Sequence, residues 1–81
     1  MEFTPKAKRD LKMLDATVQE RIIQKLEWFV RADDPLLFAH PLVDHAFGDY
    51  RFRIGDWRVM VRVRGQLLIV TRIGNRREVY R

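Results

Sequence analysis

The second half of the chain holds a dense set of arginines that could bind phosphate. Residues 50–81 contain nine Arg, no Lys and two acidic residues, for a net charge of +7. Residues 1–49 contain four Lys and three Arg against nine acidic residues, for a net charge of −2. A guanidinium group stays charged at any working pH and binds phosphate through two parallel hydrogen bonds. This distribution predicts a surface for a polyanion, and the alternative interpretation is a solvated basic surface.

The spacing of these arginines predicts a β-hairpin with one cationic face. Between residues 50 and 64, arginines alternate with apolar residues, which is the pattern of half-buried strands. Gly55 and Asp56 fit a two-residue turn with glycine in the first position. This turn would place Arg53 directly opposite Arg58, and facing like charges destabilise a sheet. A phosphate bound between the two guanidinium groups would explain the pair, unless both side chains extend into water.

Two helices are predicted to precede this hairpin. Thr4 followed by Pro5 is a typical helix start, because the hydroxyl can cap the helix and proline has its φ already set. A second helix follows, capped by Asp15 or Thr17, with one apolar arc over residues 18–30. The sequence therefore predicts two amphipathic helices, the first of them short, whose apolar faces pack on a sheet.

The helical pattern also raises a question about one tryptophan. Trp28 falls off the apolar arc of the second helix, so it packs at the edge of the core or marks a surface that another chain covers. The sequence Asp33-Asp34-Pro35 ends the helix, and the stretch that follows, up to Gly48, is predicted to be a connecting loop with at most one helical turn.

The order of elements indicates the fold class. A third strand is expected over residues 67–73, and it should lie inside the sheet because it is apolar on both faces. Residues 78–80 could add a last short strand. Helices first and strands second predict an α+β fold, with two N-terminal helices packed on a small antiparallel sheet. A length of 81 residues predicts a single domain, residues 1–81.

Several residues whose side chains could catalyse or bind are expected to have structural roles. His40 and His45 are expected to be ordinary residues of the loop before the sheet. Trp57 alternates onto the apolar face and is predicted to be a core residue rather than a platform for base stacking. Asp49 and Asp56 are expected in turns, because a carboxylate close to a bound phosphate would oppose the arginines.

Composition excludes several classes of site. The chain has no cysteine, and its two histidines and scattered acidic residues lack the spacing of metal ligands, so neither a metal nor another cofactor is expected. The first residues are acidic and lack an apolar run, and no segment approaches the roughly 20 apolar residues that span a bilayer. We therefore expect a cytoplasmic protein with no membrane partner.

Two blocks of sequence resemble a known family. Residues 50–59, YRFRIGDWRV, and residues 72–80, RIGNRREVY, resemble the signature strands of the RelE branch of the RelE/ParE toxin superfamily. The order of helices and strands extends the resemblance over nearly the whole chain. It implies a RelE-like fold and a ribosome-dependent endoribonuclease that cuts mRNA in the decoding site. It also implies a cognate antitoxin that covers or disturbs the cationic face.

The resemblance assigns roles to five residues. By position, Arg51 and Arg53 match two basic strand residues that contact RNA. Arg58 and Arg76 match arginines that stabilise the transition state. Tyr80 matches a catalytic tyrosine near the C-terminus. Apart from the resemblance, Tyr80 would be interpreted as an aromatic residue packed at the sheet edge.

One position departs from the family pattern. Many relatives have histidine where this chain has Asn75, and cleavage by 2′-hydroxyl attack needs a base, an acid and cations. Arginine does not titrate usefully near neutral pH and asparagine does not titrate, which leaves Tyr80, with a reference pKa of about 10, as the expected proton carrier. Two alternatives stay open. One is a ParE-like inhibitor of DNA gyrase, which the set Arg58, Arg76 and Tyr80 disfavours. The other is a non-catalytic RNA-binding relative, which Asn75 favours.

Overall fold

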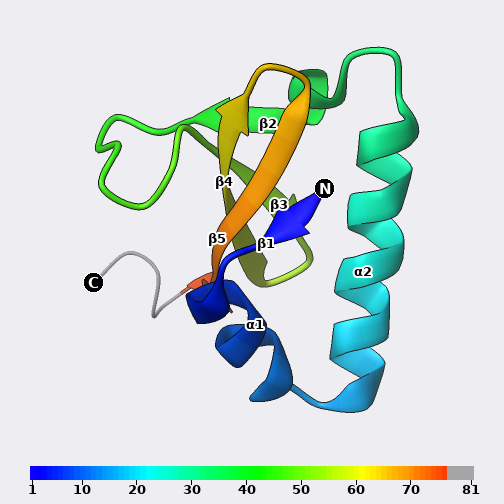
Figure 1. Ribbon diagram of the computed structural model, residues 1–81. Helices are drawn as coiled ribbons and strands as arrows, with labels where there is room; N and C mark the ends of the chain where they lie inside the picture. Colours follow the sequence, from blue (N-terminus) through cyan, green and yellow to red (C-terminus); the bar gives the residue numbers. More distant parts are fainter. Residues whose placement is uncertain (77–81) are drawn as a thin grey trace.

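The arginine-rich half of the chain forms most of a five-stranded sheet (Figure 1). The computed structural model describes residues 1–76, so Tyr80 and the strand expected over residues 78–80 lie outside the described residues. The elements are β1 (Glu2–Phe3), α1 (Pro5–Lys12), α2 (Ala16–Arg31), the 3-10 helix η1 (Pro35–Phe38), β2 (Ala39–Pro41), β3 (Tyr50–Ile54), β4 (Trp57–Arg64) and β5 (Leu67–Asn75). The predicted α+β fold, two N-terminal helices on a small sheet, is confirmed.

The strands lie in the order β1-β5-β4-β3-β2. All neighbours are antiparallel except β1, which pairs in parallel with β5. The third predicted strand therefore has a neighbour on each side, as expected from its apolar faces, and it extends to Asn75 rather than ending at Ile73. The core lies between one face of this sheet and the two helices. It contains Ala7, Ile22, Leu26, Phe29, Phe52, Ile54, Val59, Val61, Leu68, Val70 and Ile73.

The predicted start of the first helix is confirmed. The Thr4 hydroxyl oxygen accepts the Ala7 N–H at 3.1 Å, and Pro5 occupies the first helical position. Thr4 also holds the helix against β5, because its hydroxyl donates to the Thr71 carbonyl at 3.2 Å and its N–H donates to Val70 at 2.9 Å. The start of α1 is therefore fixed by residues far along the chain.

A carboxylate of α1 completes this contact with β5. One oxygen of Asp10 accepts the Ile73 N–H at 2.9 Å, and the other binds Lys6 at 2.8 Å. The strand β1 is only two residues long and pairs with Ile69 and Val70. Asp10 and Thr4 thus bond to β5 backbone groups that β1 does not reach.

The second helix begins at Ala16, and its expected capping is only partly confirmed. Asp15 holds the cap position but its side chain makes no capping hydrogen bond, and Thr17 lies inside the helix, so the capping box does not form. The Gln19 side-chain amide instead donates to the Leu14 carbonyl at 2.8 Å. The predicted apolar arc is confirmed, since it contributes three buried core residues, Ile22, Leu26 and Phe29.

Trp28 packs at the edge of the core, as the first interpretation of its position expected. Its side chain is 55% exposed, and its ring lies edge-on to Phe29 and Phe38, with centroids 5.7 and 5.1 Å apart. Phe29 continues inward by stacking on Phe52 at 4.8 Å. An aromatic series therefore links the exposed side of α2 to the centre of the sheet.

The segment predicted to be a single loop contains two elements. The helical turn left open by the sequence is η1, and β2 follows it and pairs with β3. His40 is therefore a strand residue opposite Arg51, and the prediction that it lies in a loop is wrong. The three-residue strand is too short for an alternating pattern, and Pro41 is tolerated because β2 is at the edge of the sheet. His45 does lie in the remaining loop, residues 42–49.

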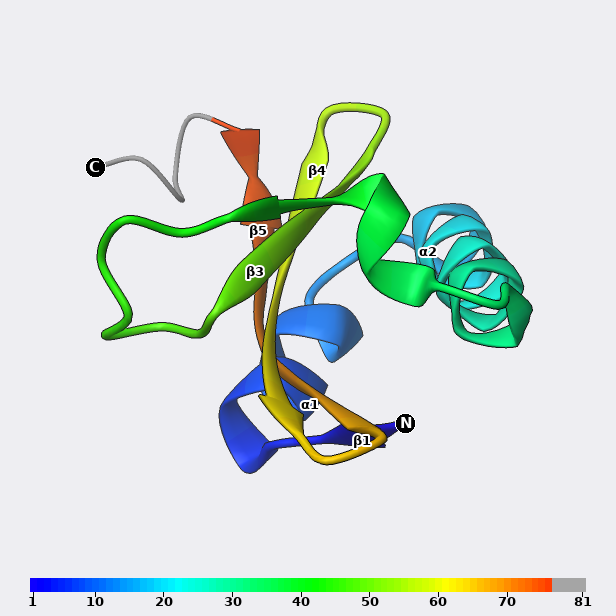
Figure 2. The same ribbon diagram turned by 90° about the horizontal axis from the view of Figure 1, so that it is seen from above.

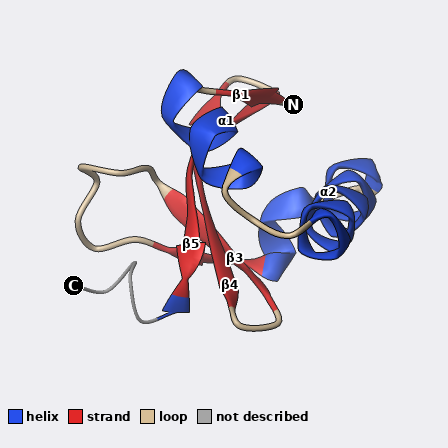
Figure 3. Cartoon of the chain, turned by 90° about the horizontal axis from the view of Figure 1, so that it is seen from below, coloured by secondary structure: helices blue, strands red, loops and turns tan. Residues whose placement is uncertain are grey.

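The first hairpin forms as predicted. Gly55 has φ 60°, Ile54 lies opposite Trp57, and Arg53 lies opposite Arg58. Trp57 packs against the core, as expected from its alternation. Seen from above, α2 covers one side of the sheet and loop 42–49 lies on the other (Figure 2). The view from below shows the same separation (Figure 3). Among residues 1–76, no helix is both long and apolar enough to cross a membrane.

Candidate nucleic-acid interface

The sheet face opposite the helices is lined by arginines. Residues paired directly across an antiparallel ladder point to the same face, so Arg53 and Arg58 share a face, as do Arg51, Met60 and Arg72. Alternation along β4 adds two more arginines to this face. We call this surface the arginine face, and it consists of Arg51, Arg53, Arg58, Arg62, Arg64 and Arg72. The predicted separation of an apolar face from a cationic face is confirmed by the burial of the alternate residues Phe52, Ile54, Val59 and Val61.

Arg58 is placed differently from the expectation of an open phosphate ligand. Its side chain is only 3% exposed, and Nη1 donates to the carbonyl oxygens of Gly55 and Trp57, each at 3.1 Å. Its Nε is buried without a hydrogen-bond partner among residues 1–76. The two carbonyl dipoles offset the charge of Arg58, and Arg53 is exposed to water. The facing arginines are therefore accommodated without a phosphate between them.

Arg76 lies at the same end of the sheet as the hairpin turn. Its N–H donates to the Asp56 carbonyl at 2.9 Å, which fastens the end of β5 to the turn, and its side chain is exposed. Arg58 lies opposite Gly74 of β5, and because glycine has no side chain, the space beside Arg58 toward β5 is not filled by its cross-strand partner. The structure thus brings Arg53 and Arg58 to one end of the arginine face and places the backbone of Arg76 beside that end, and Asp56 is a turn residue as predicted.

Arg51 lies one pleat from Arg53, and His40 lies beside it. His40 is exposed, and because it pairs with Arg51 across the ladder, it belongs to the same side of the sheet. The sequence offered no sign of this proximity, because it depends on the pairing of β2. The described residues contain no group of three or more His, Cys, Asp or Glu side chains that could hold a metal ion.

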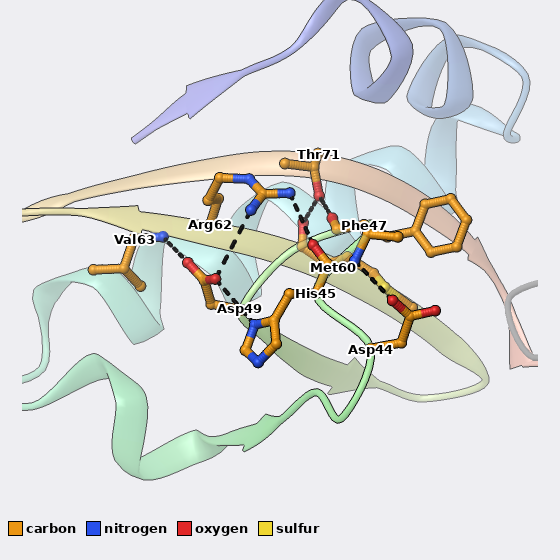
Figure 4. Close-up of polar contacts among 9 residues, drawn as sticks. Asp44, His45, Phe47, Asp49, Met60, Arg62, Val63 and Thr71 are labelled. Carbon is orange, nitrogen blue, oxygen red and sulfur yellow. Dashed lines mark hydrogen bonds and ion pairs between the residues drawn. The ribbon is translucent and has the colours of Figure 1, made fainter.

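Loop 42–49 packs on the arginine face through Asp49 (Figure 4). The Asp49 carboxylate accepts the Val63 N–H at 3.0 Å and lies 3.3 Å from His45 Nδ1 and 3.9 Å from Arg62 Nη1. The Asp49 N–H donates to Val61 at 2.8 Å. Asp49 lies at a bend of the loop, in agreement with its expected position in a turn, but the reason given for that position is wrong, because the carboxylate lies beside the Arg62 guanidinium.

The position of this loop depends on a glycine. Gly48 is buried, and a Cβ built there would lie 2.7 Å from the Val61 carbonyl oxygen, which belongs to the backbone of β4 and cannot move aside easily. Any larger residue would have to lift the loop off the sheet. Gly48 and Asp49 therefore act together: Gly48 permits the close approach, and Asp49 binds backbone groups of Val61 and Val63 in β4.

The surroundings of Asp49 predict a dependence on pH. The Val63 N–H is the main cause of a pKa below the ordinary Asp value, with smaller contributions from His45 and Arg62. Stabilisation from Asp49 is therefore full above the unfolded value of about 3.9 and is lost as the pH falls through the lower, folded value. The native protein should unfold at higher urea than Asp49→Asn near neutral pH, and this difference should shrink in acid. A difference that stays constant down to about pH 3 would contradict the assignment.

Comparison with known proteins identifies the family. The model of the ParE toxin of the type II toxin-antitoxin system parDE matches residues 1–80. A match over nearly the whole chain defines the class as a type II toxin. The chain belongs to the RelE/ParE toxin superfamily.

Solved structures show the same fold. A RelB-RelE antitoxin-toxin complex from Methanococcus jannaschii superposes with a TM-score of 0.76 at 22% identity, over 99% of this chain and 95% of that chain. The toxin-antitoxin complex RelBE2 from Mycobacterium tuberculosis gives a TM-score of 0.74 at 22% identity, over 91% of this chain and 86% of that chain. No curated protein sequence matches. The family model bears the ParE name and both structures are RelE complexes, so the choice between the two activities depends on the site residues.

Proposed function

We propose that this toxin is a ribosome-dependent endoribonuclease that cleaves mRNA. The observation that supports the proposal is that Arg53 and Arg58 lie at one end of the arginine face, where the backbone of Arg76 is bonded to the hairpin turn, with Arg51 one pleat away. Cationic side chains on a sheet can bind the phosphates of single-stranded RNA. The ribosome would hold the mRNA in the position for cleavage, which so small a domain could not do by itself. Arg51 and Arg53 would bind RNA, and Arg58 and Arg76 would act at the scissile phosphate.

The reaction expected at this site is an internal displacement. The 2′-oxygen of a ribose forms a bond to the neighbouring phosphorus as the bond to the 5′-oxygen breaks, leaving a cyclic phosphate and a 5′-hydroxyl. The 2′-hydroxyl loses a proton to a base, and the 5′-oxygen gains one from an acid. Arg76, which is exposed, suits the negative charge that develops on the phosphoryl oxygens. We assign the proton transfer to Tyr80.

The burial of Arg58 sharpens its proposed role. Its guanidinium is held by carbonyls of the hairpin turn, so it would reach a phosphate only by exchanging those hydrogen bonds for new ones. Such an exchange fits a residue that binds the phosphate when substrate is present and stabilises the hairpin turn when it is absent. Arg76 is therefore the more direct test of the transition-state assignment.

A cognate antitoxin is the proposed inhibitor. The two similar structures named above are complexes of a toxin with an antitoxin. The net charge of +7 over residues 50–81 favours an acidic partner segment, which would gain both charge neutralisation and buried area on this face. Such a segment would compete with RNA for the same arginines.

One observation favours a second function. The family model that matches is named for ParE, whose branch acts on DNA gyrase. In this alternative the arginine face would bind a protein surface and Tyr80 would have no chemical role. A non-catalytic RNA-binding relative is the third candidate, and the presence of Asn75 is the feature that favours it.

Mapping of transcript ends after induction separates the three candidates. Cuts within translated codons, dependent on translation, support the nuclease. DNA damage without such cuts supports gyrase inhibition. The absence of both, with RNA binding by the purified protein, supports the non-catalytic relative and overturns the proposal.

A further inference from the structure

Part of the arginine face is occupied by the protein itself. Loop 42–49 contacts Arg62 and Thr71 (Figure 4) and also Arg72, and the proposed reaction assigns no role to these three residues. Arg62 Nη2 donates to the His45 carbonyl at 3.2 Å, and Arg62 Nη1 lies 3.9 Å from the Asp49 carboxylate. These partners are oxygen acceptors, one of them charged.

Thr71 and Arg72 also contact the loop, through a carbonyl oxygen and an aromatic ring. The Thr71 hydroxyl donates to the Phe47 carbonyl oxygen, and it also lies 3.2 Å from the Met60 carbonyl oxygen. The Arg72 guanidinium lies 4.8 Å from the centre of the Phe47 ring. An aromatic ring over a guanidinium, beside a carboxylate and carbonyl oxygens, offers the same kinds of group as a nucleotide, with its flat base and its charged backbone.

We propose that loop 42–49 is an internal substitute for a nucleic-acid strand, and that Arg62, Thr71 and Arg72 beneath it form a second phosphate-binding subsite. A single-stranded RNA that displaces the loop would place a phosphate on Arg62 in place of Asp49, and a base on Arg72 in place of Phe47. The choice of RNA rests on the proposed function. The subsite would extend the bound strand along β4 and β5, away from the hairpin turn.

The contacts between loop 42–49 and the arginine face are weak enough for RNA to replace them. The ion pair between Asp49 and Arg62 is at 3.9 Å and partly exposed, with 29% and 31% of the two side chains accessible, so it contributes little and is screened by salt. The Phe47 and His45 side chains are exposed. A phosphate carries its own charge and several acceptor oxygens, so it can replace a carboxylate at this position.

Binding is tested with a short single-stranded RNA carrying 2′-O-methyl groups, which block attack by the 2′-oxygen and so separate binding from cleavage. Asp49→Asn removes the charge that competes for Arg62, and its amide oxygen can still accept the Val63 N–H. We expect this variant to bind the RNA about two- to fivefold more tightly than the native protein at low salt. The slope of log affinity against log salt should steepen by about 0.7, the value of one additional phosphate contact on a single strand.

Asp44→Asn is the matched control. Asp44 lies in the same loop, and its bond among residues 1–76 is to the Ala46 N–H at 3.0 Å, so this substitution removes an equal charge without freeing an arginine of that part of the chain. Gly48→Ala tests the loop without changing the charge, because its Cβ would collide with Val61. We expect Gly48→Ala to steepen the salt slope like Asp49→Asn, and Asp44→Asn to leave the slope unchanged. Adding Arg62→Gln to Asp49→Asn should return the slope to the native value.

Equal slopes for native protein, Asp49→Asn and Gly48→Ala, with thermal unfolding showing all three folded, would overturn the subsite. A measurement on Asp49→Asn gives an independent check. In this variant the Val63 amide should exchange its hydrogen faster when the RNA is bound than when the protein is free, because the RNA then displaces the loop, and unchanged exchange at saturating RNA would also overturn the proposal. These outcomes are separate from cleavage: transcripts left intact would refute the nuclease, and the slopes would still decide the subsite.

Discussion

Replacing Arg76 with Ala should slow cleavage of translated mRNA by about two orders of magnitude, which corresponds to about 3 kcal/mol of lost transition-state stabilisation. Folding should be retained, because the Arg76 side chain is exposed and the bond to Asp56 comes from the backbone N–H, which alanine keeps. The measurement pairs cleavage of mRNA on ribosomes with the thermal unfolding temperature. Arg64→Ala is the control, since Arg64 is an exposed arginine at the other end of β4.

Arg58→Ala should behave differently from Arg76→Ala. Removing its guanidinium leaves the Gly55 and Trp57 carbonyls without a charged donor, so unfolding should become easier by about 1–3 kcal/mol, in addition to the loss of cleavage. If Arg76→Ala cut mRNA at the rate of Arg64→Ala, the transition-state assignment would fall. If Arg58→Ala lost cleavage but kept the unfolding free energy of the native protein, the proposal that Arg58 stabilises the hairpin would be wrong.

Replacing Tyr80 with Phe should reduce cleavage about a hundredfold or more. The substitution removes only the hydroxyl, so packing by the ring is kept and proton transfer is lost. The controls are His40→Gln and His45→Gln, which remove the two side chains with reference pKa values closest to neutrality. Both should cleave within a few fold of the native rate.

His40 makes this comparison informative. It lies beside Arg51 on the arginine face, so it is close to the proposed RNA path although it precedes the hairpin in sequence. Native cleavage by Tyr80→Phe together with a hundredfold loss in His40→Gln would move the proton chemistry from the C-terminus to β2. His45 is already bonded to Asp49, so its replacement controls for disturbance of the loop.

Local rules explain which parts of the fold could be predicted. A two-residue turn fixes the register of its strands, so the pairing of Arg53 with Arg58 followed from the position of Gly55 and Asp56 alone. The cap at Thr4 and the apolar arc of α2 are likewise properties of neighbouring residues. The two faces of the hairpin followed from alternation.

Features set by tertiary contact could not be predicted. The strand β2 has three residues and no alternating pattern, and it forms because β3 offers a free edge. That pairing also placed His40 beside Arg51. The docking of Asp49 depends on the N–H of Val63, fourteen residues further along, which no local pattern reveals.

The site was predicted in its charge but not in its detailed arrangement. The arginine face was expected, and Arg53 and Arg58 lie at its end near the hairpin turn, where the backbone of Arg76 is bonded to Asp56. The inward turn of Arg58 toward backbone carbonyls was not expected, because sequence gives the face of a residue and not the direction of its long side chain. Tyr80 lies outside the described residues, and its role stays a prediction.

The bonds between Thr4 and β5 also constrain when this protein can complete its fold during synthesis. The Thr4 hydroxyl finds its partner 67 residues later, and the parallel pairing of Glu2 and Phe3 needs Ile69 and Val70. Glu2, Phe3 and Thr4 therefore cannot make these native contacts until residues 69–71 have been synthesised. Under the proposed activity, a toxin that attacks translating ribosomes cannot close its own sheet until a ribosome has synthesised β5.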